Sequence, residues 1–185
     1  MGKLIIFEFT SLNGYFKGPG DDISWNLHAD DEQRFSESQM KKGNILLFGR
    51  KTYQMMESYW QTPQAMANDP GVAKGMNAAE KYVVSRTLDR INWSGATLLK
   101  GDLIEEVKKL KQGPKDITIL GSGEVVTQLA DAGLIDIYQL MIFPLMIPDG
   151  TSLLSDIKGK IGLKFVSSKV LKSGTVILEY ELIKT

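Results

Sequence analysis

Three short apolar runs without polar alternation most strongly constrain how this 185-residue chain can fold. They lie at residues 44–48, 81–85 and 116–120. This pattern is typical of strands buried on both faces, which are central and parallel in sheets covered by helices. Helical periodicity in residues 51–60 and 102–112 predicts crossover helices between these strands. We therefore expect an α/β fold with helices on both faces of the sheet.

Both ends of the chain predict further strands. Residues 4–10 and 136–145 are strand-like apolar stretches. Residues 163–171 and 175–183 flank a Lys-Ser-Gly turn, which predicts a C-terminal β-hairpin. The sheet is therefore expected to be mixed, with parallel strands in the centre and the antiparallel hairpin at one end.

The remaining segments fit the same organisation. Residues 124–132 form an amphipathic helix before Gly133, and another helix is expected from Asp30 to Lys41. The polar stretch at residues 61–75 is expected to be a loop with a short helix. Because no long linker or internal repeat interrupts the pattern, residues 1–185 are expected to form a single domain.

Composition excludes several kinds of chemistry. The chain has no cysteine, which removes disulfides, thiolate nucleophiles and cysteine-containing zinc sites. Its single histidine, His28, disfavours multi-histidine metal centres and a histidine-based triad, so no metal site is expected. The 22 basic residues balance 22 acidic ones, unlike the basic surface of a nucleic-acid-binding protein. Chemistry must come from carboxylates, hydroxyls, amines or an organic cofactor.

Hydropathy predicts neither a membrane span nor an export signal. The longest nearly uncharged apolar stretch, residues 137–147, is far shorter than the ~18–20 residues that a spanning helix needs. The N-terminal apolar run at residues 4–7 is cut by Glu8 and is too short for a signal peptide. The expected location is therefore the cytoplasm, without a membrane partner.

Glycine and polar residues follow three of the predicted parallel strands, where open α/β sheets bind ligands. Glycine allows close backbone approach, the free amides of a helix N-terminus attract anions, and a guanidinium can bind a phosphate bidentately. The residues concerned are Gly49, Arg50, Lys51, Thr52, Ser85, Arg86, Gly121, Ser122, Gly123 and Glu124. The alternatives are ordinary turn glycines, solvated cations and a helix cap at Ser122. An extended, phosphate-rich ligand would reach all three strand ends.

A glycine-rich segment at residues 11–20 follows the first strand, and its many turn residues predict a mobile lid. Asp30 lies at the start of the next helix. It can form a capping box with Gln33, or it can bind an amino-substituted nitrogen heterocycle through its carboxylate. His28 is expected to make a local polar contact rather than to act as an acid or base.

Five motifs together resemble the dihydrofolate reductase superfamily, and more closely the reductase domain of the bifunctional riboflavin-biosynthesis deaminase-reductase. The resemblance covers essentially the whole chain. The motifs are SLNG at residues 11–14, WNLHAD at 25–30, FGRKTY at 48–53, VSR at 84–86 and ILGSG at 119–123.

The resemblance implies an NADPH-dependent reductase with a dihydrofolate reductase-like mixed sheet. It places residues 49–52 at the bridging phosphates, Ser85 and Arg86 at the adenosine 2′-phosphate, and residues 121–124 at the pyrophosphate and nicotinamide half. It also implies a cis peptide at Gly121–Ser122.

The same resemblance implies a small nitrogen heterocycle as substrate, either a pterin such as dihydrofolate or a ribosylaminopyrimidine. Asp30 would be the catalytic carboxylate that orients a C=N bond of this substrate, and Asn13 and Trp25 would also contact it. The alternative is a non-catalytic protein that binds or senses NADP(H). A homodimer is compatible with either function.

Overall fold

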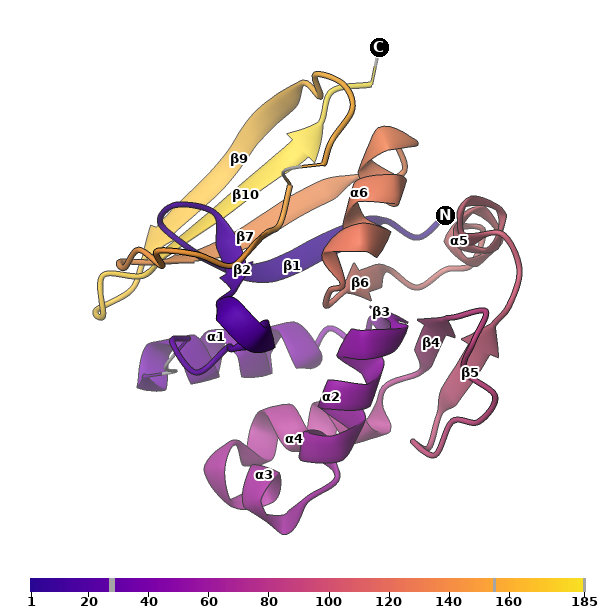
Figure 1. The fold of residues 1–185 in the computed structure, drawn as a ribbon, viewed down its shortest axis with the longest axis horizontal. Coiled ribbons are helices and arrows are strands. Elements are labelled where there is room, and N and C mark those ends of the chain that lie inside the picture. Colours follow the sequence, from indigo (N-terminus) through magenta and orange to yellow (C-terminus); the bar gives the residue numbers. More distant parts are fainter. Residues whose placement is uncertain (27–28, 155, 185) are drawn as a thin grey trace.

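The computed structural model describes residues 1–26, 29–154 and 156–184, and its largest element is an eight-stranded sheet (Figure 1). The strands are β1 (Leu4–Ser11), β2 (Tyr15–Lys17), β3 (Ile45–Gly49), β4 (Lys81–Val84), β5 (Ala96–Leu99), β6 (Ile117–Ile119), β7 (Ile137–Phe143), β8 (Thr151–Ser152), β9 (Leu163–Val170) and β10 (Val176–Leu182). The sheet order is β5-β4-β3-β6-β1-β7-β10-β9, whereas β2 and β8 pair separately. All neighbours from β5 to β7 are parallel, and β10 is antiparallel to β7 and β9. The predicted mixed sheet is therefore confirmed.

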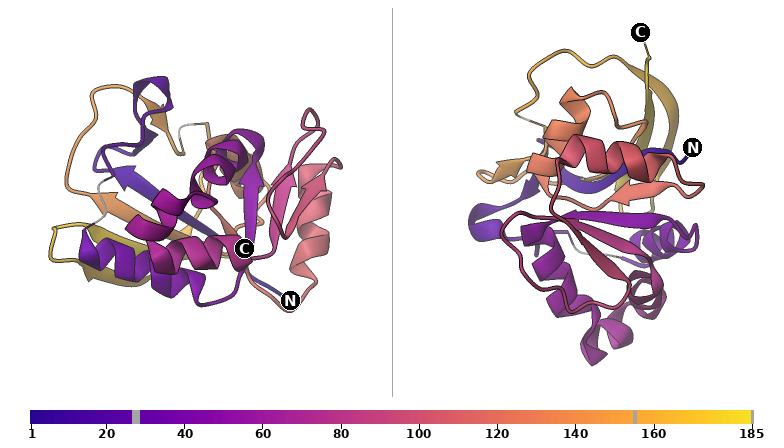
Figure 2. Two further views of the ribbon diagram at one scale, coloured as in Figure 1. Left: turned by 90° about the horizontal axis from the view of Figure 1, so that it is seen from below. Right: turned by 90° about the vertical axis from the view of Figure 1, so that its right-hand side faces the viewer.

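Helices cover both faces of the sheet, as Figure 2 shows. They are α1 (Asp30–Met40), α2 (Arg50–Trp60), α3 (Pro63–Asn68), α4 (Pro70–Ala78), α5 (Leu103–Lys111) and α6 (Gly123–Asp131), with a short 3-10 helix at Pro19–Asp21. Helices α5 and α6 pack into one apolar cluster, and α2 and α4 pack into another. The described helices include none that is long and apolar enough to cross a membrane.

Strand β3 explains why the central strands lack polar alternation. Ile45 and Leu47 pack in the cluster with α5 and α6, whereas Leu46 and Phe48 pack on the opposite face with α2 and α4. Because helices bury both faces, every residue of this strand is buried.

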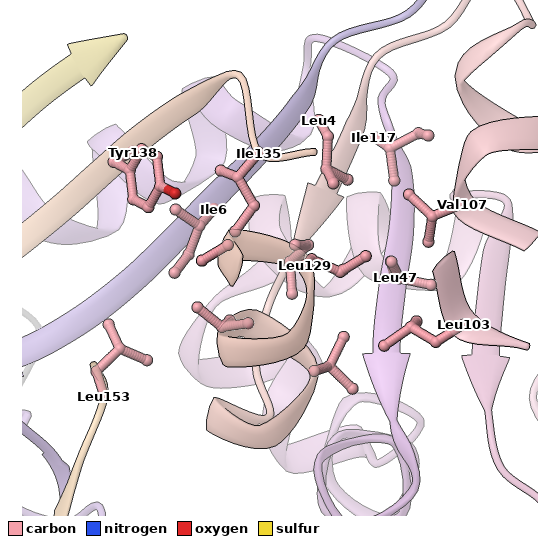
Figure 3. Packing of buried hydrophobic residues seen from close by; sticks show 14 of the residues in the cluster. Leu4, Ile6, Leu47, Leu103, Val107, Ile117, Leu129, Ile135, Tyr138 and Leu153 are labelled. Carbon is pink, nitrogen blue, oxygen red and sulfur yellow. The ribbon is translucent and has the colours of Figure 1, made fainter. Parts of the chain in front are cut away.

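The larger cluster is centred on α6 and is shown from close by in Figure 3. Leu129 of α6 faces the side chains of β1 and β6, and Leu103 and Val107 of α5 extend the cluster toward β3. Burial of each such side chain contributes about 1.5–3 kcal/mol. This packing fixes α6 against the sheet, and the N-terminus of α6 reaches the edge where β3, β4 and β6 end.

Residues 61–75 differ from the prediction, because they form two helices, α3 and much of α4, instead of a loop with one short helix. Pro63 and Pro70 lie in the first turns of α3 and α4, where proline is compatible with a helix, and two glycines of α4 permit close helix packing. A Cβ at Gly71 would lie 2.4 Å from Glu37 Cδ, and one at Gly75 would lie 2.5 Å from Met40 Cβ. Both contacts are with α1, so these glycines let α4 lie directly against that helix.

A buried ion pair anchors the start of β1. Asp136 accepts hydrogen bonds from the Leu4 N–H at 2.8 Å and from the Lys111 ammonium, and both charged side chains are largely buried. Burial of Asp136 opposes its ionisation, but these hydrogen bonds hold its pKa below the usual range. The pair therefore ties β1 to α5 and to the residue that precedes β7.

Asp136→Ala should lower the free energy of unfolding by about 3 kcal/mol or more, because it removes the carboxylate partner of a buried ammonium and leaves a backbone N–H unpaired. Asp89→Ala is the control, since the Asp89 side chain is 91% exposed and its change should stay within about 0.5 kcal/mol. Urea denaturation of both variants measures the difference. Equal stabilities would show that Asp136 does not anchor the strand.

Candidate functional site

The carboxyl ends of β3, β4 and β6 border one cleft of about 830 Å³. All three predicted strand-end segments contribute to its surface. The predicted residues that line it are Gly49, Arg50, Lys51, Ser85, Arg86, Ser122, Gly123 and Glu124. The expectation that the three segments meet at one edge of the sheet is therefore confirmed.

The turns after β3 and β6 approach each other closely inside this cleft. A Cβ at Gly49 would lie only 2.4 Å from Ser122 Oγ, and the Gly49 N–H donates to the Gly121 carbonyl at 3.4 Å. The Gly121–Ser122 peptide is cis, as the resemblance implied, and Gly121 has φ +85°. Glycine at residues 49 and 121 thus permits the contact between the two turns.

Two helices begin at this contact with unsatisfied backbone N–H groups. The N-cap residues of α2 and α6 are Gly49 and Ser122, and neither helix has a side-chain cap. Ser122 occupies the cap position without making a capping hydrogen bond, so the capping alternative for its side chain is wrong. By contrast, Asp102 caps α5 with two hydrogen bonds. Free N–H groups at two adjacent helix N-termini are suited to bind an anion.

Cationic side chains surround these helix N-termini. Arg50, Lys51 and Arg86 are exposed and line the cleft, and the largely buried Lys17 lines it from β2. Ser85 positions its neighbour, because its Oγ accepts from the N–H groups of residues 87 and 88 at 3.2 and 2.9 Å. This turn leaves Arg86 exposed at the end of β4. The residues present therefore fit a long ligand with several phosphates.

Thr52 and Gly121 are buried and are not among the residues that line the cleft. Thr52 Oγ1 has no hydrogen-bond partner. A Cβ at Gly121 would lie 3.1 Å from this oxygen, so the two residues are in contact directly behind the cleft surface.

Two of the residues predicted to contact the substrate instead contact other residues of the protein. The Asn13 side chain bonds Ser11 Oγ and both backbone groups of Ile147. Trp25 packs edge-to-face on Phe143 at 5.7 Å, and its buried Nε1 has no partner. The structure does not bring either residue to the cleft surface.

Asp30 also lies outside the cleft. It is the first residue of α1, after the N-cap Ala29, and no side chain caps this helix, so the capping box with Gln33 is wrong. Asp30 is exposed and lines a smaller pocket of about 200 Å³ between α1 and the start of α4. The prediction for His28 falls outside the described residues.

The predicted lid forms one side of the cleft. It contains β2, which pairs with β8, and Phe16 lines the cleft next to Gly123. Its motion remains a prediction. Within the described ranges, no three His, Asp or Glu side chains come together as a metal site.

Sequence reasoning missed Glu8 of β1. Its Oε1 is buried without a hydrogen-bond partner, and a Cβ at Gly121 would lie 2.9 Å from it. Burial raises the pKa of Glu8 to about 8, although the charge of Lys17 and the Phe9 N–H partly oppose this rise. The available signal was a carboxylate inside an apolar strand, because an acidic residue is seldom buried without a reason.

The sheet order, the C-terminal antiparallel strands and the cleft at the strand ends define a dihydrofolate reductase-like fold. The RibD C-terminal domain family matches residues 2–177, and the chain belongs to this family.

Individual proteins are similar over nearly the whole chain. The "Uncharacterized protein YyaP" of Bacillus subtilis (strain 168) is 28% identical over 179 residues, which are 96% of this chain and 94% of YyaP. The crystal structure of a "Putative riboflavin biosynthesis protein" from Shewanella sp. PV-4 matches with TM-score 0.77 and 20% identity over 98% of this chain and 99% of that one. Enterococcus faecalis dihydrofolate reductase complexed with NADP(H) matches with TM-score 0.69 and 15% identity, covering 99% and 98%. These structures are similar in fold.

Glu8→Gln should change the pH dependence of stability. Because the pKa of Glu8 is raised to about 8 in the folded state, its stabilising protonation is complete below the unfolded value of 4.5 and is lost as pH rises to about 8. The neutral amide does not titrate. The melting temperature of Glu8→Gln minus that of the unmodified protein should therefore increase from about pH 5 to about pH 8 and then stay constant.

Thermal melts across this pH range measure the effect. Glu105→Gln, at an exposed position of α5, is the control for removal of one carboxylate and should show no such trend. A constant difference for Glu8→Gln would mean that Glu8 is ionised like a surface carboxylate.

Proposed function

We propose that this protein is an NADPH-dependent reductase of a small nitrogen heterocycle. The observation that carries the proposal is the cleft where two uncapped helix N-termini meet three exposed cationic side chains. A dinucleotide phosphate offers several anionic groups along an extended molecule, which suits this distribution of charge. Membership of the RibD C-terminal domain family and the fold shared with an NADP(H)-complexed dihydrofolate reductase support it.

Each part of the cleft has a proposed role. The first turns of α2 and α6, with Arg50 and Lys51, would bind the bridging phosphates, and Ser85 and Arg86 would bind the adenosine 2′-phosphate. The turn at residues 121–124 would contact the pyrophosphate and nicotinamide half. When bound, the reduced nicotinamide supplies a hydride. The proposal treats residues 1–185 as one cytoplasmic reductase domain, compatible with a homodimer.

Ligand-dependent melting tests the cofactor. A ligand at 100 times its dissociation constant stabilises the folded protein by ~2.7 kcal/mol, so NADPH should raise the melting temperature more than NADH. Arg86→Ala should reduce the shift caused by NADPH and leave the NADH shift nearly unchanged, because only NADPH carries the 2′-phosphate. Equal losses with both nucleotides would remove Arg86 from that role, and no shift with either would contradict the cofactor.

Asp30 is the proposed substrate-orienting carboxylate. Asp30→Asn should lower turnover of the heterocycle while leaving the NADPH-induced melting shift intact, since Asp30 does not line the larger cleft. Steady-state rates with 7,8-dihydrofolate and with a ribosylaminopyrimidine, together with melts, measure the two effects. If Asp30→Asn has a lower melting temperature but normal turnover rates, Asp30 contributes to stability alone.

A non-catalytic NADP(H)-binding or sensing protein is the second candidate. It is favoured by the positions of Asp30 outside the cleft and Phe16 within it. Saturation-transfer NMR on the NADPH-saturated protein separates the two functions. A reductase should also bind a reducible heterocycle, whereas a sensor should bind the nucleotide alone.

A further inference from the structure

Two buried oxygens without hydrogen-bond partners converge behind the cleft. Glu8 Oε1 comes from β1 and Thr52 Oγ1 from α2, and both lie against Gly121. Buried polar atoms in folded proteins almost always have partners, and exceptions concentrate at functional sites. The two oxygens occupy neighbouring positions, although their elements are far apart in sequence. Their convergence indicates a site rather than two unrelated defects.

The surroundings of the Glu8 carboxyl are nearly uncharged. Lys17 from β2 is the charged side chain that acts on it among the described residues, and Lys17 is itself paired with Asp21 at 3.2 Å. The other elements present neutral groups: Thr52 from α2, the Gly121 turn before α6, and Leu140 of β7 opposite Glu8. Burial therefore dominates and raises the pKa of Glu8 to about 8, so this carboxyl is mostly protonated near neutral pH.

The Gly121–Ser122 turn separates Glu8 from the cleft. Ser122 and Lys17 line the cleft surface, whereas Glu8 contacts the turn from behind. Under the proposed function, this turn lies at the nicotinamide half of the cofactor. Glu8 would then be a buried carboxyl directly behind the turn that contacts the ring whose charge changes during the reaction.

We propose that Glu8 releases its proton as the nicotinamide becomes positively charged, so that the ionisation of this buried carboxyl is coupled to the redox state of the cofactor. This inference rests on the proposed function. Reduction of a C=N bond forms one C–H bond with the hydride from the reduced nicotinamide and one N–H bond with a proton, while the C=N π bond breaks. Because Glu8 does not line the cleft, the substrate takes this proton from water. Separately, the Glu8 O–H bond breaks and water accepts its proton, and the carboxylate recovers a proton from water when the oxidised cofactor leaves.

Electrostatics couple the proton to the redox state. The reduced ring is neutral and does not affect the carboxyl, whereas the oxidised ring is a cation that stabilises the Glu8 carboxylate. NADP⁺ should therefore favour ionised Glu8, and NADPH should not. This linkage can be measured without knowing the substrate.

The experiment measures dissociation constants of NADP⁺ and NADPH by calorimetry from about pH 6 to about pH 9. In the unmodified protein, NADP⁺ binding should tighten relative to NADPH binding by up to about tenfold per pH unit until about pH 8, and then level off. Near pH 7, NADP⁺ should release close to one proton, detected from the buffer dependence of the heat. The ratio of the two constants cancels titration of the phosphates, because both nucleotides carry them.

Glu8→Gln should bind both nucleotides with a ratio independent of pH, and Asp30→Asn should retain the pH dependence. A flat ratio in the unmodified protein overturns the proposal even if the Glu8 variant fails to fold. It is also overturned if Asp30→Asn, and not Glu8→Gln, removes the pH dependence. Absence of binding by either nucleotide would instead contradict the proposed function itself.

Discussion

The contact between the turns after β3 and β6 determines the geometry of the whole cleft. Gly49 has no side chain, so Ser122 can lie where any larger residue would place its Cβ. The contact brings the first residues of α2 and α6 together with their backbone N–H groups free. Without it, the two helix N-termini would be separate, and each would be only a weak anion site.

The central sheet could be predicted because strands that are buried on both faces are made of consecutive apolar residues. The runs at 44–48, 81–85 and 116–120 correspond to β3, β4 and β6 within one residue at each end. Sequence periodicity did not predict the elements whose structure depends on tertiary contacts. Helix α4 contains two glycines that serve its packing on α1, and β5 is a four-residue edge strand with too few residues to form a pattern.

In the candidate site too, some residues could be recognised from the sequence, whereas the positions of others depend on tertiary contacts. The strand-end residues could be found because parallel strands direct their carboxyl ends to one edge. Asp30 was selected from a linear motif, but helix phase and the position of α4 place it beside a different pocket. Glu8 was passed over because an acidic residue in a short apolar run resembles an interruption. Only the surrounding fold shows that its carboxyl is buried.

The position of β1 has a consequence for how the chain assembles. This strand is synthesised before β6 and β7, yet it lies between them, so Leu4 pairs with Ile117 and Ile5 with Ile137. Such distant pairs must close long loops, which slows folding. During synthesis, β1 cannot be enclosed until β6 and β7 have left the ribosome. The burial that keeps Glu8 protonated is therefore acquired late, and incomplete chains would carry this residue as an ordinary, ionised glutamate.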